Sequence, residues 1–214
     1  MTPHSVGRCP KDRGDRLPLG EPFFKRVFLN KQRIYFCIDD TLMFALVLWE
    51  NIMVRKDKDN YYLDLAEVVA QRCTCLRRHY GAIIVKNDEV ISTGYVGAPR
   101  GRKNCSDMGV CIREKLNIPR GERYELCRSV HAEANAIISA SRRDMLGASL
   151  YLVGTEVSTG EYVSGGNSCS MCKRMVINAG IERVIVRDDK ENFRVINVSE
   201  WVENDESLSG VFGY

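Results

Sequence analysis

The sequence predicts an α/β fold, a three-layer α-β-α sandwich with a central mixed sheet between helices. Apolar residues at helical spacing alternate along the chain with short β-branched runs, and the first two of these runs form a hairpin. The resulting order is helix, hairpin, helix, strand, helix, strand, which places helices on both faces of one sheet. With 214 residues the chain is long enough for one such domain with a full core.

The elements follow one another from residue 56 onward. We expect an amphipathic helix over 56–71, because its apolar residues recur at helical spacing. Strands follow over 81–85 and 90–94, and Asn87-Asp88 between them favours a tight turn. The remaining expected elements are a helix over 131–140, a strand over 149–153, a helix over 169–179 that Gly180 ends, a strand over 183–187 and a further strand over 194–198.

The cysteine content indicates the cellular compartment. The chain has nine cysteines, an odd number, and no signal peptide is recognisable. These observations predict a cytoplasmic protein whose thiols stay reduced, some of them bound to metal. The formal net charge of +3 is too small to indicate nucleic acid as a partner, and we expect no membrane association.

Residues 1–52 differ in character from the rest of the chain. Residues 1–20 are polar, and the clean apolar stretch, 41–49, is too short to cross a bilayer. Three interpretations remain open: an extra packed helix, an interfacial helix, or a sequence that is not naturally made. We favour the last, because the codons of Trp49-Glu50 must contain GGGA, which in a bacterium is a ribosome-binding sequence correctly placed for a start at Met53. The predicted domains are an extension, 1–52, and a functional domain, 53–214.

Two short motifs carry the chemistry, His131-x-Glu133 and Cys169-x-x-Cys172. One imidazole and two thiolates leave one position open on a tetrahedral zinc ion, which is typical of catalytic rather than structural sites. Hydroxide held at that position would be the nucleophile, and Glu133 would shuttle protons to the substrate ring and the leaving amine. Alone, Cys-x-x-Cys is also typical of a structural zinc half-site or a redox pair, but the combination favours catalysis.

Residues 61–188 resemble the cytidine and deoxycytidylate deaminase superfamily, and within it the zinc-dependent deoxycytidylate (dCMP) deaminases. The segments that carry the resemblance are 81–85 (GAIIV), 94–101 (GYVGAPRG), 131–137 (HAEANAI) and the Cys-x-x-Cys motif. The resemblance implies a cytidine deaminase-like fold with a five-stranded sheet, a Zn²⁺ cofactor, and hydrolytic deamination of dCMP to dUMP with release of ammonia. It also implies a homo-oligomer that dCTP activates and dTTP inhibits.

Two positions depart from the pattern of that family. Ser168 stands where the family usually has a proline, and we expect its hydroxyl to cap the following helix instead. Val96 stands where the family commonly has an asparagine that helps to hold the sugar, and a valine side chain can neither donate nor accept a hydrogen bond. The sequence therefore supports the metal chemistry better than the identity of the substrate.

A cysteine-rich insert at about 95–127 suggests a second, structural zinc site. Some phage-type dCMP deaminases hold such a zinc with cysteines that match Cys75 and Cys105, but their other two ligands fall at Gly121 and Ser129, which cannot bind zinc. We therefore predict an all-cysteine site formed by Cys75, Cys105, Cys111 and Cys127. Cys73 could replace Cys75, and buried free cysteines remain the alternative.

The same insert holds basic residues that suit a substrate phosphate, because arginine forks match phosphate oxygens. These residues are Arg100, Arg102, Lys103 and Arg113. We predict that Tyr95, Arg100 and Arg113 contact a nucleotide substrate. A solvated charged loop is the alternative interpretation.

The leading hypothesis is therefore a zinc-dependent hydrolase of pyrimidine nucleotide metabolism that acts on dCMP. Other deaminases of the superfamily remain open, with cytosine, guanine, a riboflavin precursor or tRNA adenosine as substrate. A third hypothesis is a zinc-stabilised binding module without activity, such as a DNA-uptake accessory. Val96 favours this module, whereas the intact Glu133 argues against it.

Overall fold

The computed structural model describes residues 26–29, 32–35, 55–119 and 121–205. Its contacts divide the chain into two units, Met1–Arg55 and Lys56–Tyr214. The first unit contains an antiparallel pair of strands, β1 (Arg26–Leu29) and β2 (Gln32–Tyr35). The hypotheses on the apolar stretch 41–49 and on a start at Met53 concern positions outside the described residues. Among the described helices, none has the length and apolar character needed to span a bilayer.

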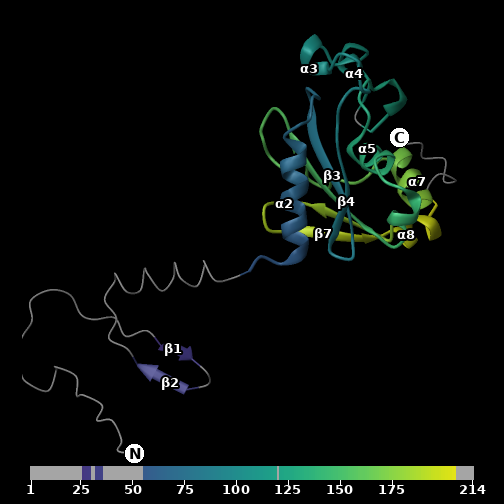
Figure 1. Ribbon diagram of the computed structural model, residues 1–214. Helices are drawn as coiled ribbons and strands as arrows, with labels where there is room; N and C mark the ends of the chain where they lie inside the picture. The colour runs from purple at the N-terminus through teal and green to yellow at the C-terminus, as the bar shows by residue number, and fades with distance from the viewer. Residues whose placement is uncertain (1–25, 30–31, 36–54, 120, 206–214) are drawn as a thin grey trace, which may run out of the picture. The chain divides into compact units, whose positions relative to one another are not determined.

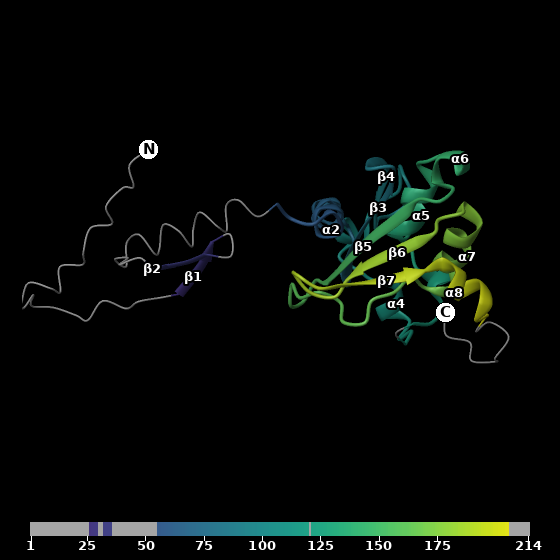
Figure 2. The same cartoon turned by 90° about the horizontal axis from the view of Figure 1, so that it is seen from below.

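The second unit is built on a five-stranded mixed sheet with the order β4-β3-β5-β6-β7, which can be followed in Figure 2 and is seen from another side in Figure 1. Its strands are β3 (Arg78–Lys86), β4 (Glu89–Tyr95), β5 (Ser149–Glu156), β6 (Arg183–Arg187) and β7 (Phe193–Asn197). Strands β5 and β6 run parallel, and the other neighbouring pairs are antiparallel. The mixed five-stranded sheet expected from the sequence is thus confirmed.

Helices cover both faces of this sheet (Figures 1 and 2). Helix α2 (Lys58–Ala70) packs on one face, and α5 (Ala132–Ile138), α7 (Ser170–Ala179) and α8 (Val198–Glu203) pack on the other. Shorter helices lie in the connections: α3 (Cys105–Met108), α4 (Ile112–Lys115), η2 (Tyr124–Leu126) and α6 (Arg142–Met145). The three-layer architecture is the predicted one, although the sequence pattern did not reveal the short helices.

Strand β5 shows why both faces must be covered. Leu150 and Leu152 lie in the core beneath α5 and α7, whereas Tyr151 and Val153 lie in the core beneath α2. Successive side chains of a strand point to opposite faces, so a continuous apolar run needs a helical layer on each side.

Local signals placed several boundaries correctly. Asn87 and Asp88 have φ of 52° and 69°, as the tight turn between β3 and β4 requires. Gly180 ends α7 with φ of 78°. Strand β3, however, begins at Arg78 rather than at Gly81, because Arg78 and the residues after it pair with β5.

The close approach of α5 to the sheet depends on Gly94 in β4. A Cβ atom at this position would lie 2.2 Å from the carbonyl oxygen of Ala132 and 2.3 Å from the amide nitrogen of Ala136. The Ser92 hydroxyl adds a hydrogen bond of 2.8 Å to the Ala136 carbonyl oxygen. The missing side chain therefore sets the depth of α5 against β4.

We expect Gly94→Ala to destabilise the fold by about 1–3 kcal/mol, because the added methyl group meets helix backbone rather than a movable side chain. Chemical denaturation measures this change in the free energy of unfolding. Ile138→Ala, at an exposed position of the same helix, is the control and should change it by less than about 0.5 kcal/mol. Equal stability of Gly94→Ala and the wild type would contradict this account of the packing.

Candidate active site

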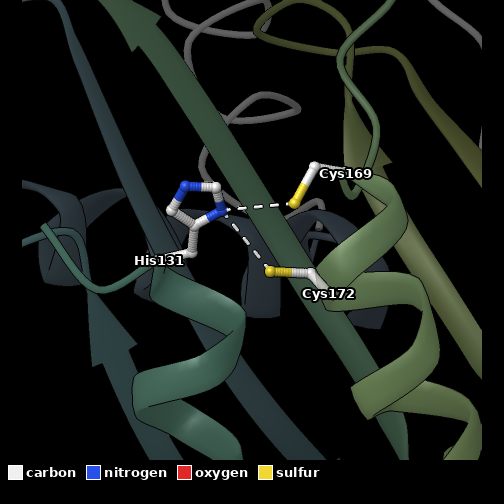
Figure 3. A group of neighbouring side chains, drawn as sticks. All are labelled: His131, Cys169 and Cys172. Carbon is white, nitrogen blue, oxygen red and sulfur yellow. Dashed lines mark hydrogen bonds between the residues drawn. The ribbon is translucent and has the colours of Figure 1, made fainter. Parts of the chain in front are cut away.

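Two helix N-termini bring the three predicted metal ligands together. His131 is the N-cap residue of α5, Cys169 is the N-cap residue of α7, and Cys172 lies in the first turn of α7 (Figure 3). Both helices pack on the same face of the sheet and contact each other. Side chains that are about forty positions apart in the sequence thereby share one site.

The donor atoms of these residues have the spacing of zinc ligands. His131 Nδ1 lies 3.4 Å from Cys169 Sγ and 3.5 Å from Cys172 Sγ. In a tetrahedral site, Zn–N and Zn–S bonds of about 2.0 and 2.3 Å place nitrogen and sulfur about 3.5 Å apart. Among the described residues, this is the only group of three or more His, Cys, Asp or Glu side chains whose donor atoms all lie within 4.8 Å of one another. The three residues therefore fit zinc and supply three of its four corners.

The surroundings of the two thiols favour a thiolate at Cys169. The pKa of Cys169 is lowered, first by a hydrogen bond from Cys172 and then by His131. The pKa of Cys172 is raised by the same hydrogen bond and by burial. Because Cys169 occupies the N-cap position of α7, the helix dipole supports its negative charge.

Glu133 lies in the first turn of α5, two residues beyond His131. Its side chain is only 5% exposed and lines the same cavity as His131 and Cys169. Burial raises the pKa of this carboxyl group. It can therefore hold a proton closer to neutral pH than an exposed glutamate can, which suits an acid–base role.

The residue before the first cysteine does not cap α7. Cys169 rather than Ser168 is the N-cap residue, and the buried Ser168 hydroxyl makes no hydrogen bond to the first amides of the helix. The expectation of a serine cap is therefore wrong. Helix α7 begins at Ser170, so Cys169 and not Ser168 occupies the position before its first residue.

A cavity of about 460 Å³ is lined by two of the three donor residues, His131 and Cys169. Its walls come from β3, from the insert around α4 and η2, and from the glycine-containing loop 163–167 between β5 and α7. Tyr80, Tyr124 and the loop were not identified in the sequence as site residues. A signal for the loop was available, because Gly165-Gly166 comes shortly before the Cys-x-x-Cys motif.

Arg113 brings a positive charge to the wall of this cavity. Its side chain is 5% exposed and donates hydrogen bonds to the carbonyl oxygens of Pro119, at 2.9 Å, and of Glu122. The guanidinium carbon lies 4.4 Å from the centre of the Tyr124 ring. That ring meets His131 edge to face, with centroids 5.0 Å apart. These contacts fix the position of the guanidinium beside the metal ligands.

No carboxylate among the described residues forms an ion pair with Arg113, although the exposed Glu125 senses its charge at longer range. The buried Nε of Arg113 has no hydrogen-bond partner there, which is also true of the Nε of Arg187. Arg187 is similarly buried but pairs with both Asp64 and Glu67, at 2.9 and 3.1 Å. A buried charge without a counter-ion is costly unless an anion can bind beside it. The environment of Arg113 therefore indicates an anion-binding position.

The other two predicted substrate contacts lie elsewhere. Tyr95 ends β4, is 37% exposed and does not line the cavity. Arg100 is exposed in the turn that follows and does not line it either. Arg77 and Arg78 do line the cavity, but each has an acidic partner, Glu114 at 3.4 Å and Glu156 at 2.8 Å.

The four cysteines of the expected second zinc site do not lie as close to one another as the three donors of the first site. Cys75, Cys111 and Cys127 line the cavity, whereas Cys105 is buried with its sulfur 3.8 Å from the hydroxyl of Ser129. No three of these four sulfur atoms, all within the described range, form a group as close as the first site. The second zinc ion therefore stays a prediction.

The sequence is similar to those of known deaminases. Residues 56–188 match the family described as the cytidine and deoxycytidylate deaminase zinc-binding region. The deoxycytidylate deaminase of Mycobacterium phage D29 is 37% identical over 138 residues, which are 62% of this chain and 96% of that protein. That of Schizosaccharomyces pombe is 35% identical over 106 residues, 45% of this chain but only 33% of that protein. The crystal structure of dCMP deaminase from the cyanophage S-TIM5 in apo form is 25% identical, with a TM-score of 0.44, over 63% of this chain and 85% of that chain.

The fold, the donor set and the buried glutamate together define a zinc-dependent deaminase site. The family's zinc-binding region covers well over half of the chain, including all three metal ligands and Glu133. The chain belongs to the cytidine and deoxycytidylate deaminase family.

We expect Cys172→Ala to lose the zinc ion of this site, because only two protein donors would remain. Elemental analysis of the purified protein measures zinc per chain. Met171→Ala, in the same helical turn but without a donor of the site, is the control and should keep its zinc. Retention of the wild-type zinc content by Cys172→Ala would refute the assignment. A second zinc ion per chain that survives this substitution would support the all-cysteine site, and a single zinc ion in the wild type would count against it.

Proposed function

We propose that the protein is a hydrolase that converts dCMP and water into dUMP and ammonia. The observation that carries the proposal is the buried Glu133 carboxyl group beside three zinc donors, in a cavity that Arg113 also lines without a counter-ion in the described residues. The Glu133 carboxyl group and the three zinc donors suit deamination. The guanidinium of Arg113 suits the phosphate of a nucleotide. The relatives named above as deoxycytidylate deaminases supply the choice of base and sugar.

The site residues divide the reaction between them. His131, Cys169 and Cys172 would hold the zinc ion, which would supply the Lewis acidity that makes water reactive near neutral pH. Glu133 accepts a proton from this water and delivers it to the ring nitrogen next to the reacting carbon. It then carries the second proton of the same water, from the newly added hydroxyl group, to the amine, which leaves as ammonia, and the oxygen becomes the new carbonyl oxygen of dUMP. One molecule of water is consumed for each ammonia released.

Arg113 holds the substrate phosphate in this proposal. The carbonyl oxygens of Pro119 and Glu122 and the ring of Tyr124 already restrain its guanidinium. Little side-chain entropy is then lost when the phosphate binds, which favours affinity. A phosphate also supplies the negative charge that the buried arginine lacks.

Other features remain part of the proposal. They are a homo-oligomer, activation by dCTP, inhibition by dTTP and a cytoplasmic location, all of which the family resemblance or the cysteine content predicts. An extension over 1–52 and a natural start at Met53 are proposed on the sequence alone.

We expect the zinc-loaded protein to release ammonia from dCMP, and Glu133→Gln to lower kcat by at least about 100-fold because the proton carrier is lost. An ammonia assay measures turnover, and zinc content should not change. Glu182→Gln, at an exposed position before β6, is the control and should turn over normally. Ammonia from cytosine or guanine but not from dCMP would transfer the assignment to another deaminase. Absence of ammonia from every substrate would favour the binding module.

We expect Arg113→Gln to raise KM for dCMP by about 10- to 100-fold, the effect of losing a charge-assisted hydrogen bond. KM for deoxycytidine should change much less, because this substrate has no phosphate. Arg113→Lys should restore part of the affinity, since it keeps the charge. Arg143→Gln, an exposed position in α6, is the control. Equal losses with dCMP and deoxycytidine would show that Arg113 only stabilises the insert.

A further inference from the structure

One wall of the cavity is an aromatic ring that rests on a glycine. Tyr80 in β3 and Gly154 in β5 are directly opposite each other in the antiparallel register. A Cβ atom at Gly154 would lie 2.2 Å from Cε1 and 2.6 Å from Cζ of Tyr80. The ring therefore occupies the space that any other side chain at position 154 would fill.

The hydroxyl of this ring faces the cavity rather than a protein acceptor among the described residues. Tyr80 lines the cavity, and its hydroxyl lies 3.9 Å from the Cβ position of Gly166, another lining residue. The structure gives it no hydrogen-bond partner among the described residues. By contrast, Tyr62, Tyr151 and Tyr162 each donate to a carboxylate, at 2.6, 2.7 and 2.9 Å. Tyr80 is half-buried and lines the cavity, so a ligand bound there can supply the acceptor that the described residues do not.

Tyr80 has a basic neighbour, Arg78, and an acidic neighbour, Glu133, which belong to different parts of the site. Arg78 lies two residues earlier on the same face of β3. Glu133 and Tyr124 also act on the phenol electrostatically. Burial raises the pKa of Tyr80 to about 12, so its hydroxyl keeps its proton and can serve as a donor near neutral pH.

We propose that Tyr80 is a substrate-binding residue whose hydroxyl donates a hydrogen bond to an oxygen acceptor of the bound nucleotide. This inference rests on the proposed function, which puts the reacting carbon at Glu133 and the phosphate at Arg113. Between those ends, a pyrimidine nucleotide offers the carbonyl oxygen of the base and the 3′-hydroxyl of the sugar. Both acceptors are present in dCMP and in dUMP. Gly154 is the position that makes room for the donor.

The first test compares Tyr80→Phe with Tyr151→Phe. Tyr80→Phe should lower kcat/KM for dCMP by about 3- to 10-fold, the effect of one neutral hydrogen bond. Tyr151→Phe removes a phenol that donates to Asp59 outside the cavity and should leave kcat/KM unchanged. Unchanged kcat/KM in Tyr80→Phe would overturn the proposal.

A second substrate identifies the acceptor. With 2′,3′-dideoxycytidine 5′-monophosphate, equal kcat/KM values of Tyr80→Phe and the wild type assign the contact to the 3′-hydroxyl. If the difference persists, the contact is to the base carbonyl. Either result supports a hydrogen bond from Tyr80.

Calorimetric titration with dUMP separates this inference from the proposed function. If the wild type binds dUMP but does not deaminate dCMP, the proposed deaminase function is refuted. A loss of dUMP affinity in Tyr80→Phe would then still support the hydrogen bond from Tyr80. Failure of the wild type to bind either nucleotide would overturn both. Gly154→Ala should weaken dUMP binding because it displaces the ring, and it should destabilise the protein far less when combined with Tyr80→Val. Additive effects of these two substitutions on stability would refute the packing of the ring on Gly154.

Discussion

The site depends on holding one nitrogen and two sulfur atoms, from two separate helices, within the span of a single zinc ion. Metal–ligand distances tolerate deviations of only about 0.2 Å, so the backbones that carry the donors must be placed almost as accurately. Gly94 sets the depth of α5, and the shared core fixes α7 beside it. The sheet thus acts as the rigid support that keeps His131 opposite Cys169.

The sequence allowed much of this scaffold to be predicted, because its signals are local. Strand β6 was expected over the residues it occupies, since a β-branched run between turn residues needs no distant information. The turn at Asn87-Asp88 and the end of α7 at Gly180 likewise follow from residues that tolerate positive φ. The metal ligands were recognisable because their residue types and spacing reflect the chemistry of zinc itself.

Other parts of the site could not be predicted, because they depend on contacts between distant segments. Nothing near Tyr80 in the sequence indicates that its ring lies on Gly154, more than seventy residues away. Arg100 and Tyr95 are close in sequence to the loop after β4, but that proximity does not bring them to the cavity. Arg113 does reach the cavity, and its lack of a counter-ion is apparent only once the partners of each buried charge are known. The short helices of the insert are likewise shaped by packing rather than by periodicity.

Strands β5 and β6 are parallel neighbours, so the chain between them has to cross over the sheet, and α7 is part of this crossover. The segment that leaves β5 passes along the cavity at 163–167 before it reaches Cys169. Tyr162 and Val163 fold back and pair with the end of β5, whereas the residues that follow, 164–167, belong to a loop, and loops tolerate insertion and replacement. Selectivity for different nucleotides can therefore diverge through these few residues during evolution, while the zinc-holding framework on either side of them is inherited without change.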